Sequence, residues 1–122
     1  MDAGVLTTEY GQIRITDKAI AQLARTACLT VPGVAQMDAR FNDVIPSVIT
    51  GEDAQGVQVS VDDNDIHVEL YFTAYHGVRM PDLALTVQKT VKLVLKEETG
   101  FSVSRVDVNI QDVVFRKEGE NG

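Results

Sequence analysis

Apolar residues recur along this chain with two different spacings, and each spacing predicts a different element. Apolar and polar residues alternate in residues 12–15, 57–61, 66–73 and 106–111. This alternation is typical of β-strands that bury one face. The second and third segments flank residues 62–65, whose Asp and Asn side chains suit a turn, so we expect a hairpin. In the last segment the alternation shifts phase at Ser104-Arg105, which indicates a bulge or a bend.

Two other segments have the three- and four-residue spacing of amphipathic helices. The first covers residues 18–30 and follows Thr16 and Asp17, which supply capping oxygens. The second begins at Pro81, because proline suits the first helical position, and ends at Gly100 after about five turns. Its inward stripe is expected to consist of Leu83, Val87, Val91, Val94, Leu95 and Glu98.

This order of elements predicts an α+β fold with two layers. We expect a mixed or antiparallel sheet of about four strands, with two helices on one face. Residues 1–9 are expected to form a flexible N-terminus, residues 10–115 a single domain and residues 116–122 a disordered tail. The irregular stretch 38–56 is expected to be a mobile loop.

If both helices cover one face of the sheet, the other face is exposed. Strand alternation assigns polar side chains to that face, together with one aromatic residue, Tyr71. An exposed aromatic among polar neighbours is a signal of an interface. The expected interaction face consists of His67, Glu69, Tyr71, Thr73, Arg105 and Asn109.

The charge balance disfavours two classes of partner. The chain has 122 residues, with 11 Lys and Arg against 18 Asp and Glu, so its net charge is −7. This charge repels nucleic acid and anionic lipid headgroups, and we expect direct binding to neither. Residues 1–8 lack the basic and apolar stretches of a secretory signal, and no apolar run approaches the length of a membrane span. We therefore expect a cytoplasmic protein whose membrane association, if any, requires a partner.

The residues that carry chemistry do not form a recognisable catalytic or metal-binding motif. No G-x-S-x-G sequence is present, and His67 and His76 are out of phase for a shared metal ion. The acidic residues 62–65 lack the glycine and glutamate of a calcium loop, and the glycines do not form a nucleotide-binding fingerprint. Cys28 is the single cysteine and lies on an apolar helix face, which is typical of a small buried hydrophobe. We expect no catalytic residue, no metal, no cofactor and no enzymatic activity.

The main alternative is an RNA-binding or regulatory module. The segment Gly77-Val78-Arg79-Met80 lies between a strand and a helix, like the GXXG loop of KH domains, although the second glycine is missing. Lys89, Lys92 and Lys96 add a modest basic stripe to the exposed helix face. The default interpretation of that stripe is a solvated helix surface.

Four segments, in order, resemble the alkaline shock protein family, also called Gls-type general stress or envelope stress response proteins. The signature loop 75–81 carries most of the resemblance, through Tyr75, Gly77, Arg79 and Pro81. The other segments are residues 11–17, residues 31–35 with the sequence Val-Pro-Gly-Val-Ala, and residues 99–113. The resemblance extends from about Tyr10 to Val113. Met80 and Asp82 depart mildly from the family pattern, and residues 41–55 are acidic where many members carry lysine.

This resemblance implies a cytoplasmic bacterial protein that has no established catalytic activity and serves envelope homeostasis under stress. Some members of the family reach the membrane through a separate anchor protein and self-assemble. The function that we expect is therefore a non-enzymatic scaffold or adaptor, acting through homo-oligomerisation and protein partners. A membrane anchor protein is one such partner.

Overall fold

A computed structural model of the chain describes residues 2–38 and 56–116. Within these ranges the chain forms six strands and two helices, which add strands at residues 2–8 and 34–37 to the elements predicted from the sequence. The elements are β1 (Asp2–Thr8), β2 (Gly11–Thr16), α1 (Asp17–Leu29), β3 (Val34–Met37), β4 (Val57–Asp62), β5 (Asp65–Tyr75), α3 (Met80–Thr99) and β6 (Ser102–Val114). The expected mobile loop 38–56 and the expected tail 116–122 lie almost wholly outside the described residues.

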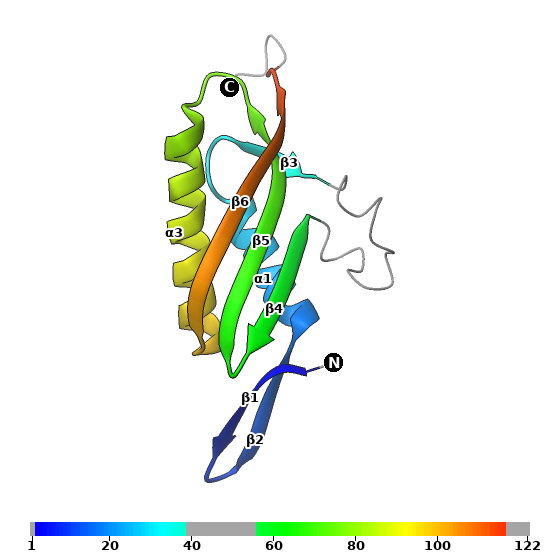
Figure 1. Cartoon of the computed structure of the whole chain (residues 1–122), viewed down its shortest axis with the longest axis vertical. Coiled ribbons are helices and arrows are strands. Elements are labelled where there is room, and N and C mark those ends of the chain that lie inside the picture. Colours follow the sequence, from blue (N-terminus) through cyan, green and yellow to red (C-terminus); the bar gives the residue numbers. More distant parts are fainter. Residues whose placement is uncertain (1, 39–55, 117–122) are drawn as a thin grey trace.

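Strand β5 is the centre of a four-stranded mixed sheet (Figure 1). Strand β6 runs parallel to β5 along one edge, while β4 and β3 are antiparallel to it. Strand β4 pairs with residues 65–70 of β5, and β3 pairs with residues 72–74 of β5. The two strands therefore lie one after the other along the second edge of β5. At their junction the amide of Asp38 donates to the carbonyl of Tyr71, and the amide of Tyr71 donates to the carbonyl of Gly56, both at 2.8 Å.

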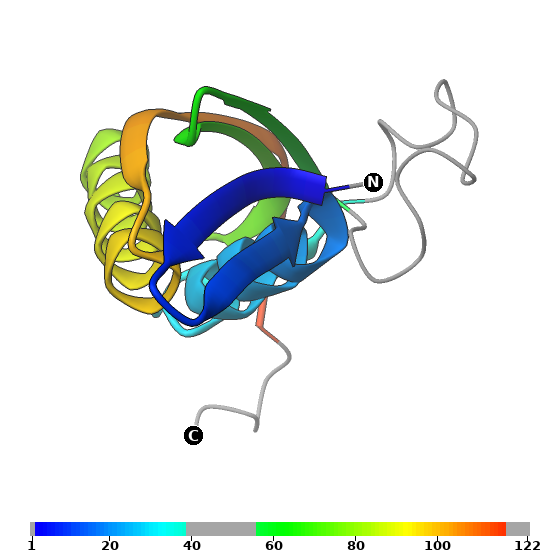
Figure 2. The ribbon, with the colours of Figure 1, turned by 90° about the horizontal axis from the view of Figure 1, so that it is seen from below.

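Both helices pack on the same face of this sheet, as Figure 2 shows from below. The expected α+β fold of two layers is therefore confirmed. Burial explains the arrangement, because apolar residues at strand and helix spacing meet between the layers. The largest fully buried side chains are Phe72, Ile20, Ile66, Leu70, Leu95, Val68, Val87, Val91 and Cys28.

The helix boundaries follow the local chemistry of the sequence. Thr16 caps α1, and its Oγ1 accepts a hydrogen bond of 3.1 Å from the amide of Ala19. The predicted stripe of α3 is confirmed except at Glu98, which is exposed. Buried positions recur every four residues from Leu83, and this spacing leads to Thr99 instead. The Thr99 hydroxyl donates a hydrogen bond to the carbonyl of Leu95 at 2.6 Å, so this buried polar group has a partner.

The expectation of a flexible N-terminus is wrong for residues 2–8, which form strand β1 and pair with β2. This hairpin extends past one end of the main sheet (Figure 1). Asn64 fixes it there, because its side chain accepts from the amide of Val5 at 3.2 Å and donates to the carbonyl of Val5 at 3.0 Å. Gly4 of the same hairpin packs closely against Phe101, since a Cβ on Gly4 would lie only 2.4 Å from Cε2 of Phe101.

The predicted irregularity in the last strand is confirmed as a register shift between β5 and β6, opposite Ile66 and His67. A second shift, at Phe72 and Thr73, was not predicted. Beyond β6, the guanidinium of Arg116 lies 4.0 Å from the ring centroid of Tyr75. The expected tail therefore does make contact with the domain at its first residue.

Neither helix within residues 2–38 and 56–116 combines the length and the apolar character that crossing a membrane requires.

Candidate functional site

Two of the segments that carry the family resemblance, residues 31–35 and 75–81, meet in space although residues 36–74 separate them in the sequence. The amide of Tyr75, at the start of the signature loop, donates a 2.9 Å hydrogen bond to the carbonyl of Gly33. Gly33 has a φ of +108°, and a Cβ on it would lie 3.0 Å from Cδ1 of Leu83 and 3.2 Å from Cγ1 of Val78. A glycine therefore allows the turn after α1 to pack directly against the start of α3.

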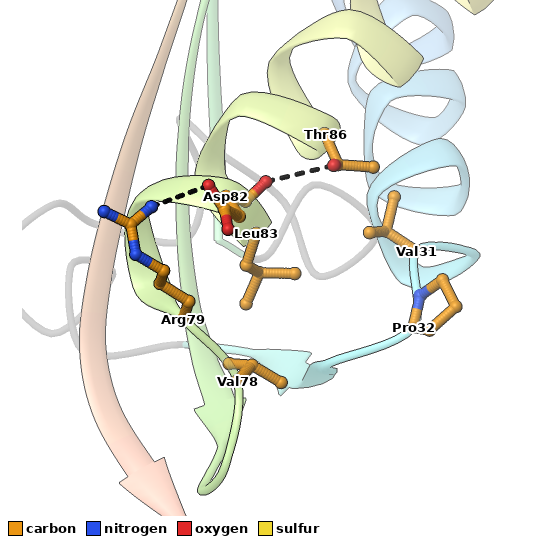
Figure 3. Close-up of a pocket in the computed structure, with 7 residues that line it drawn as sticks. All are labelled: Val31, Pro32, Val78, Arg79, Asp82, Leu83 and Thr86. Carbon is orange, nitrogen blue, oxygen red and sulfur yellow. Dashed lines mark hydrogen bonds and ion pairs between the residues drawn. The ribbon is translucent and has the colours of Figure 1, made fainter.

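An open groove of about 330 Å³ lies where these segments meet, and Figure 3 shows the side chains around it. Its lining residues are Val31, Pro32, Val78, Arg79, Asp82, Leu83 and Thr86. Four of the seven are apolar, and they come from both sides of the contact at Gly33. The groove therefore offers a small apolar surface, open to solvent, between the end of α1 and the beginning of α3.

The polar rim of the groove is organised by the first turn of α3. Nη1 of Arg79 lies 2.8 Å from Oδ1 of Asp82, and the Thr86 hydroxyl donates to the carbonyl of Asp82 at 3.0 Å (Figure 3). The Arg79 and Asp82 side chains are 71% and 70% exposed, so this ion pair adds little to stability. Its geometric effect is to hold the two charged groups at the edge of the apolar floor.

The four signature residues have different places in this arrangement. Arg79 lines the groove, and Pro81 lies in the first turn of α3. Gly77 adopts a φ of +102° in an exposed turn, and Tyr75 packs against Arg116. The loop is fixed further by His76, whose ring stacks on Phe115 at a centroid distance of 4.3 Å. Of the four signature residues, therefore, only Arg79 lines the groove, and the others shape the loop and helix start beside it.

The sequence-based prediction missed most of the groove. Val31, Pro32 and Val78 lie within segments that resemble the family, so the signal was present, but it gave no spatial relation between them. Leu83 was predicted only as a core residue, and no signal pointed to Thr86.

The predicted interaction face on the sheet is less exposed in the structure than the sequence led us to expect. Tyr71 and Thr73 are only 8% and 3% exposed, so the expectation that they stand open to solvent is wrong. Tyr71 is absent from the core between sheet and helices, as its strand phase predicts. It is nevertheless buried, at the point where its backbone bonds to Asp38 and Gly56 at the junction of β3 and β4.

Two of the remaining residues of that face, His67 and Arg105, share the carboxylate of Asp107. Nε2 of His67 lies 3.1 Å from Oδ2 of Asp107, and Nη2 of Arg105 lies 3.2 Å from an Asp107 carboxylate oxygen. The hydrogen bond with His67, followed by that with Arg105, lowers the pKa of Asp107 below its usual value. Asn109 donates to the carbonyl of Leu70 at 3.2 Å, so its amide is used within the sheet.

Two further groups on this face have shifted pKa values. Loss of solvation raises the pKa of the Tyr71 phenol, and the nearby carboxylates of Glu69 and Asp107 raise it further. A hydrogen bond of 2.6 Å from the Ser102 hydroxyl lowers the pKa of Asp65. Each shift follows from a structural hydrogen bond or from burial, and none creates a group poised for proton transfer near neutral pH.

The described residues also offer little to nucleophilic or metal chemistry. Cys28 is fully buried, and desolvation raises the pKa of its thiol to about 12, so the reactive thiolate is absent at neutral pH. In residues 2–38 and 56–116, no three His, Cys, Asp or Glu side chains lie close enough together to hold a metal ion.

Proteins with similar sequences occur in Bacillus and Streptococcus. YloU of Bacillus subtilis is 30% identical over 111 residues, covering 88% of this chain and 92% of YloU. YqhY of Bacillus subtilis is 28% identical, covering 88% of this chain and 81% of its own length. Spy1614 of Streptococcus pyogenes is 28% identical, covering 95% and 97% respectively. All three are described as uncharacterized proteins.

Among solved structures, a variant of the MamM CTD superposes with a TM-score of 0.48 at 14% identity, covering 78% of this chain and 95% of that one. A similarity at this level does not indicate a shared function.

The sequence model of the alkaline shock protein 23 family, described as having a cell envelope-related function, matches residues 5–115. The match includes all four segments on which the resemblance was based, and so confirms it. The chain therefore belongs to the alkaline shock protein 23 family, whose function is related to the cell envelope.

Proposed function

We propose that this protein serves the cell envelope as a non-enzymatic scaffold or adaptor, acting through self-association and protein partners. In this proposal it works in the cytoplasm and reaches the membrane through an anchor protein. The observation that carries the proposal is the meeting of two signature segments at an apolar groove, open to solvent. The family resemblance and the binding surface thus coincide.

The shape and chemistry of the groove favour a protein ligand. Its volume of about 330 Å³ is at the lower end of ligand pockets, which measure about 300–1,000 Å³. An apolar side chain from a partner fits such a space, with Val31, Val78 and Leu83 beneath it and the Arg79–Asp82 pair at the rim. A few anchors of this kind usually dominate the affinity of a protein interface.

Filling the groove tests this proposal. Thr86 is exposed on α3 and lines the groove, so Thr86→Trp adds bulk there without opening a cavity in the core. Thr26→Trp is the matched control, because Thr26 is exposed on α1 and is not among the groove residues. Both variants should melt within about 4 °C of the wild type, which corresponds to roughly 1 kcal/mol for a domain of this size.

The functional measurement is complementation of a deletion strain under cell-envelope stress, together with cross-linking of partners in those cells. We expect Thr86→Trp to lose complementation and at least one cross-linked partner, while Thr26→Trp retains both. Full activity of a folded Thr86→Trp protein would remove the groove from the mechanism. A purified protein that turns over a substrate would contradict the non-enzymatic part of the proposal.

A further inference from the structure

The outward face of α3 carries an unusual combination of exposed side chains. Leu85 and Leu93 are 49% and 55% exposed, and Lys89, Lys92 and Lys96 are exposed between and beside them. At about 100° per residue, all five side chains fall within about 100° of the helix circumference. The buried stripe that begins at Leu83 faces the opposite way, toward the sheet. These five residues are called the Leu–Lys stripe below.

The Leu–Lys stripe is positively charged, although the whole chain carries a net negative charge. The net charge is −7, yet residues 86–96 contain three lysines and no acidic residue. Throughout the described part of the chain, the three ammonium groups form no ion pair. The lysine charges are therefore available to an external carboxylate.

Single exposed leucines and solvated lysines are ordinary features of protein surfaces. Their spacing here is less ordinary. Leu85 and Leu93 are eight residues apart, which is about 12 Å along the helix; Lys89 lies midway between them, and Lys92 and Lys96 lie to one side. Exposed apolar residues about two helical turns apart, with cations between and beside them, can contact a second amphipathic helix along its length.

We propose that the Leu–Lys stripe binds an acidic amphipathic helix of a partner protein. Apolar residues of that helix cover Leu85 and Leu93, and its carboxylates meet Lys89, Lys92 and Lys96. Charge complementarity selects this occupant. A phosphate backbone would use the lysines but not the leucines, and an anionic lipid surface would be repelled by the rest of the chain.

This inference rests on the proposed function in one respect, because both take the chain to bind proteins. The two surfaces share no residue but adjoin on α3, because Thr86 and Leu93 are seven residues apart and point in directions about 20° apart. Thr86 belongs to the groove, while Leu85 and Leu93 do not line it. Thr86→Trp is therefore also measured in the binding experiment below, and an unchanged affinity for the acidic helix assigns its cellular defect to the groove and not to the stripe.

The experiment uses the full chain and a labelled synthetic helix with leucine on one face and glutamate on the other, measured by fluorescence anisotropy. We expect Leu85→Ser/Leu93→Ser to weaken binding at least tenfold. Leu29→Ser is the matched control, since Leu29 is 37% exposed on α1, and it should leave the affinity unchanged. All these residues are exposed, so the variants should keep the melting temperature of the wild type.

Charge is tested with a second pair of variants. Lys92→Gln/Lys96→Gln should weaken binding several-fold and reduce its dependence on salt, whereas Lys92→Arg/Lys96→Arg should preserve both. The same synthetic helix with lysine in place of glutamate should not bind.

Four outcomes would overturn the proposal. The first is an affinity that does not change when both leucines are replaced. The second is equal binding of the lysine version of the helix. The third is tighter binding to phosphatidylserine vesicles or to poly(U) RNA than to the acidic helix. The fourth is a dimer of the purified protein, seen by light scattering, that dissociates in Leu85→Ser/Leu93→Ser, because the occupant would then be a second copy.

Discussion

Replacement of Asn64 should release the N-terminal hairpin from the end of the main sheet. Asn64 lies in the turn between β4 and β5 with a φ of 62°, and its side chain makes both hydrogen bonds to the backbone of Val5. Each bond is partly buried and links residues 59 positions apart in the sequence. Asn64→Ala removes both bonds and also places an alanine in a left-handed conformation.

The expected loss of stability has two parts. Two hydrogen bonds contribute about 1–3 kcal/mol together, at about 0.5–1.5 kcal/mol each. A left-handed backbone adds about 1–2 kcal/mol for a residue with a Cβ that lacks a local polar group. Asn64→Ala should therefore cost about 2–5 kcal/mol. Asp63→Ala is the matched control, because Asp63 has a φ of 54° in the same turn but makes no bond to β1. Asp63→Ala should therefore lose only the stability that the left-handed backbone conformation accounts for.

Urea denaturation followed by circular dichroism gives the two free energies of unfolding. Amide hydrogen exchange then shows where protection is lost, and Asn64→Ala should expose the amides of β1 and β2 while leaving those of β5 protected. Equal losses of stability in the two variants, with unchanged exchange in β1, would show that the bonds to Val5 do not hold the hairpin.

Four other outcomes follow from features of the structure. Tyr71→Ser should cost about 3–5 kcal/mol, measured by thermal melting, because the side chain is enclosed; a cost near zero would mean that it is exposed in solution. Gly33→Ala should destabilise the domain by about 1–3 kcal/mol, since a Cβ is strained at its φ and crowds the groove, whereas a stable variant would contradict the close approach seen here. Cys28 should resist a thiol reagent at pH 8 until the protein unfolds, and rapid labelling of the native protein would refute its burial. Because the pKa of Asp107 is lowered on folding, the wild type should be more stable than Asp107→Asn above pH 3.8, and this advantage should disappear as the pH falls through the lower, folded-state pKa.

Burial patterns explain why most of the fold could be predicted from the sequence. The alternation in β4, β6 and the first half of β5, and the three- and four-residue spacing in α1 and α3, each arise from one buried face, and that face is visible in the residue order. Strand β1 was missed because its position depends on Asn64 and Phe101, which lie far away in the chain.

The candidate site was less accessible to prediction for a similar reason. Strand phase correctly removed Tyr71 from the helix-facing core, but phase carries no information about the strands on either side. The groove depends on the contact of Gly33 with Val78 and Leu83, which only the tertiary arrangement creates. Sequence patterns therefore identified segments that form this site, but they did not predict that these segments lie side by side in the fold.

The junction of β3 and β4 also has a practical use. One residue, Tyr71, holds both Asp38 and Gly56 through its backbone, so these two residues are fixed beside each other by the sheet. The entropy of closing a loop between fixed ends grows slowly, by about 0.6 kcal/mol for each doubling of its length. A fluorescent protein or an affinity tag inserted between Asp38 and Gly56 would therefore leave and re-enter the sheet at the same point. It would also leave the chain termini, the groove and the Leu–Lys stripe unmodified, so the protein could be followed in living cells while each surface is altered in turn.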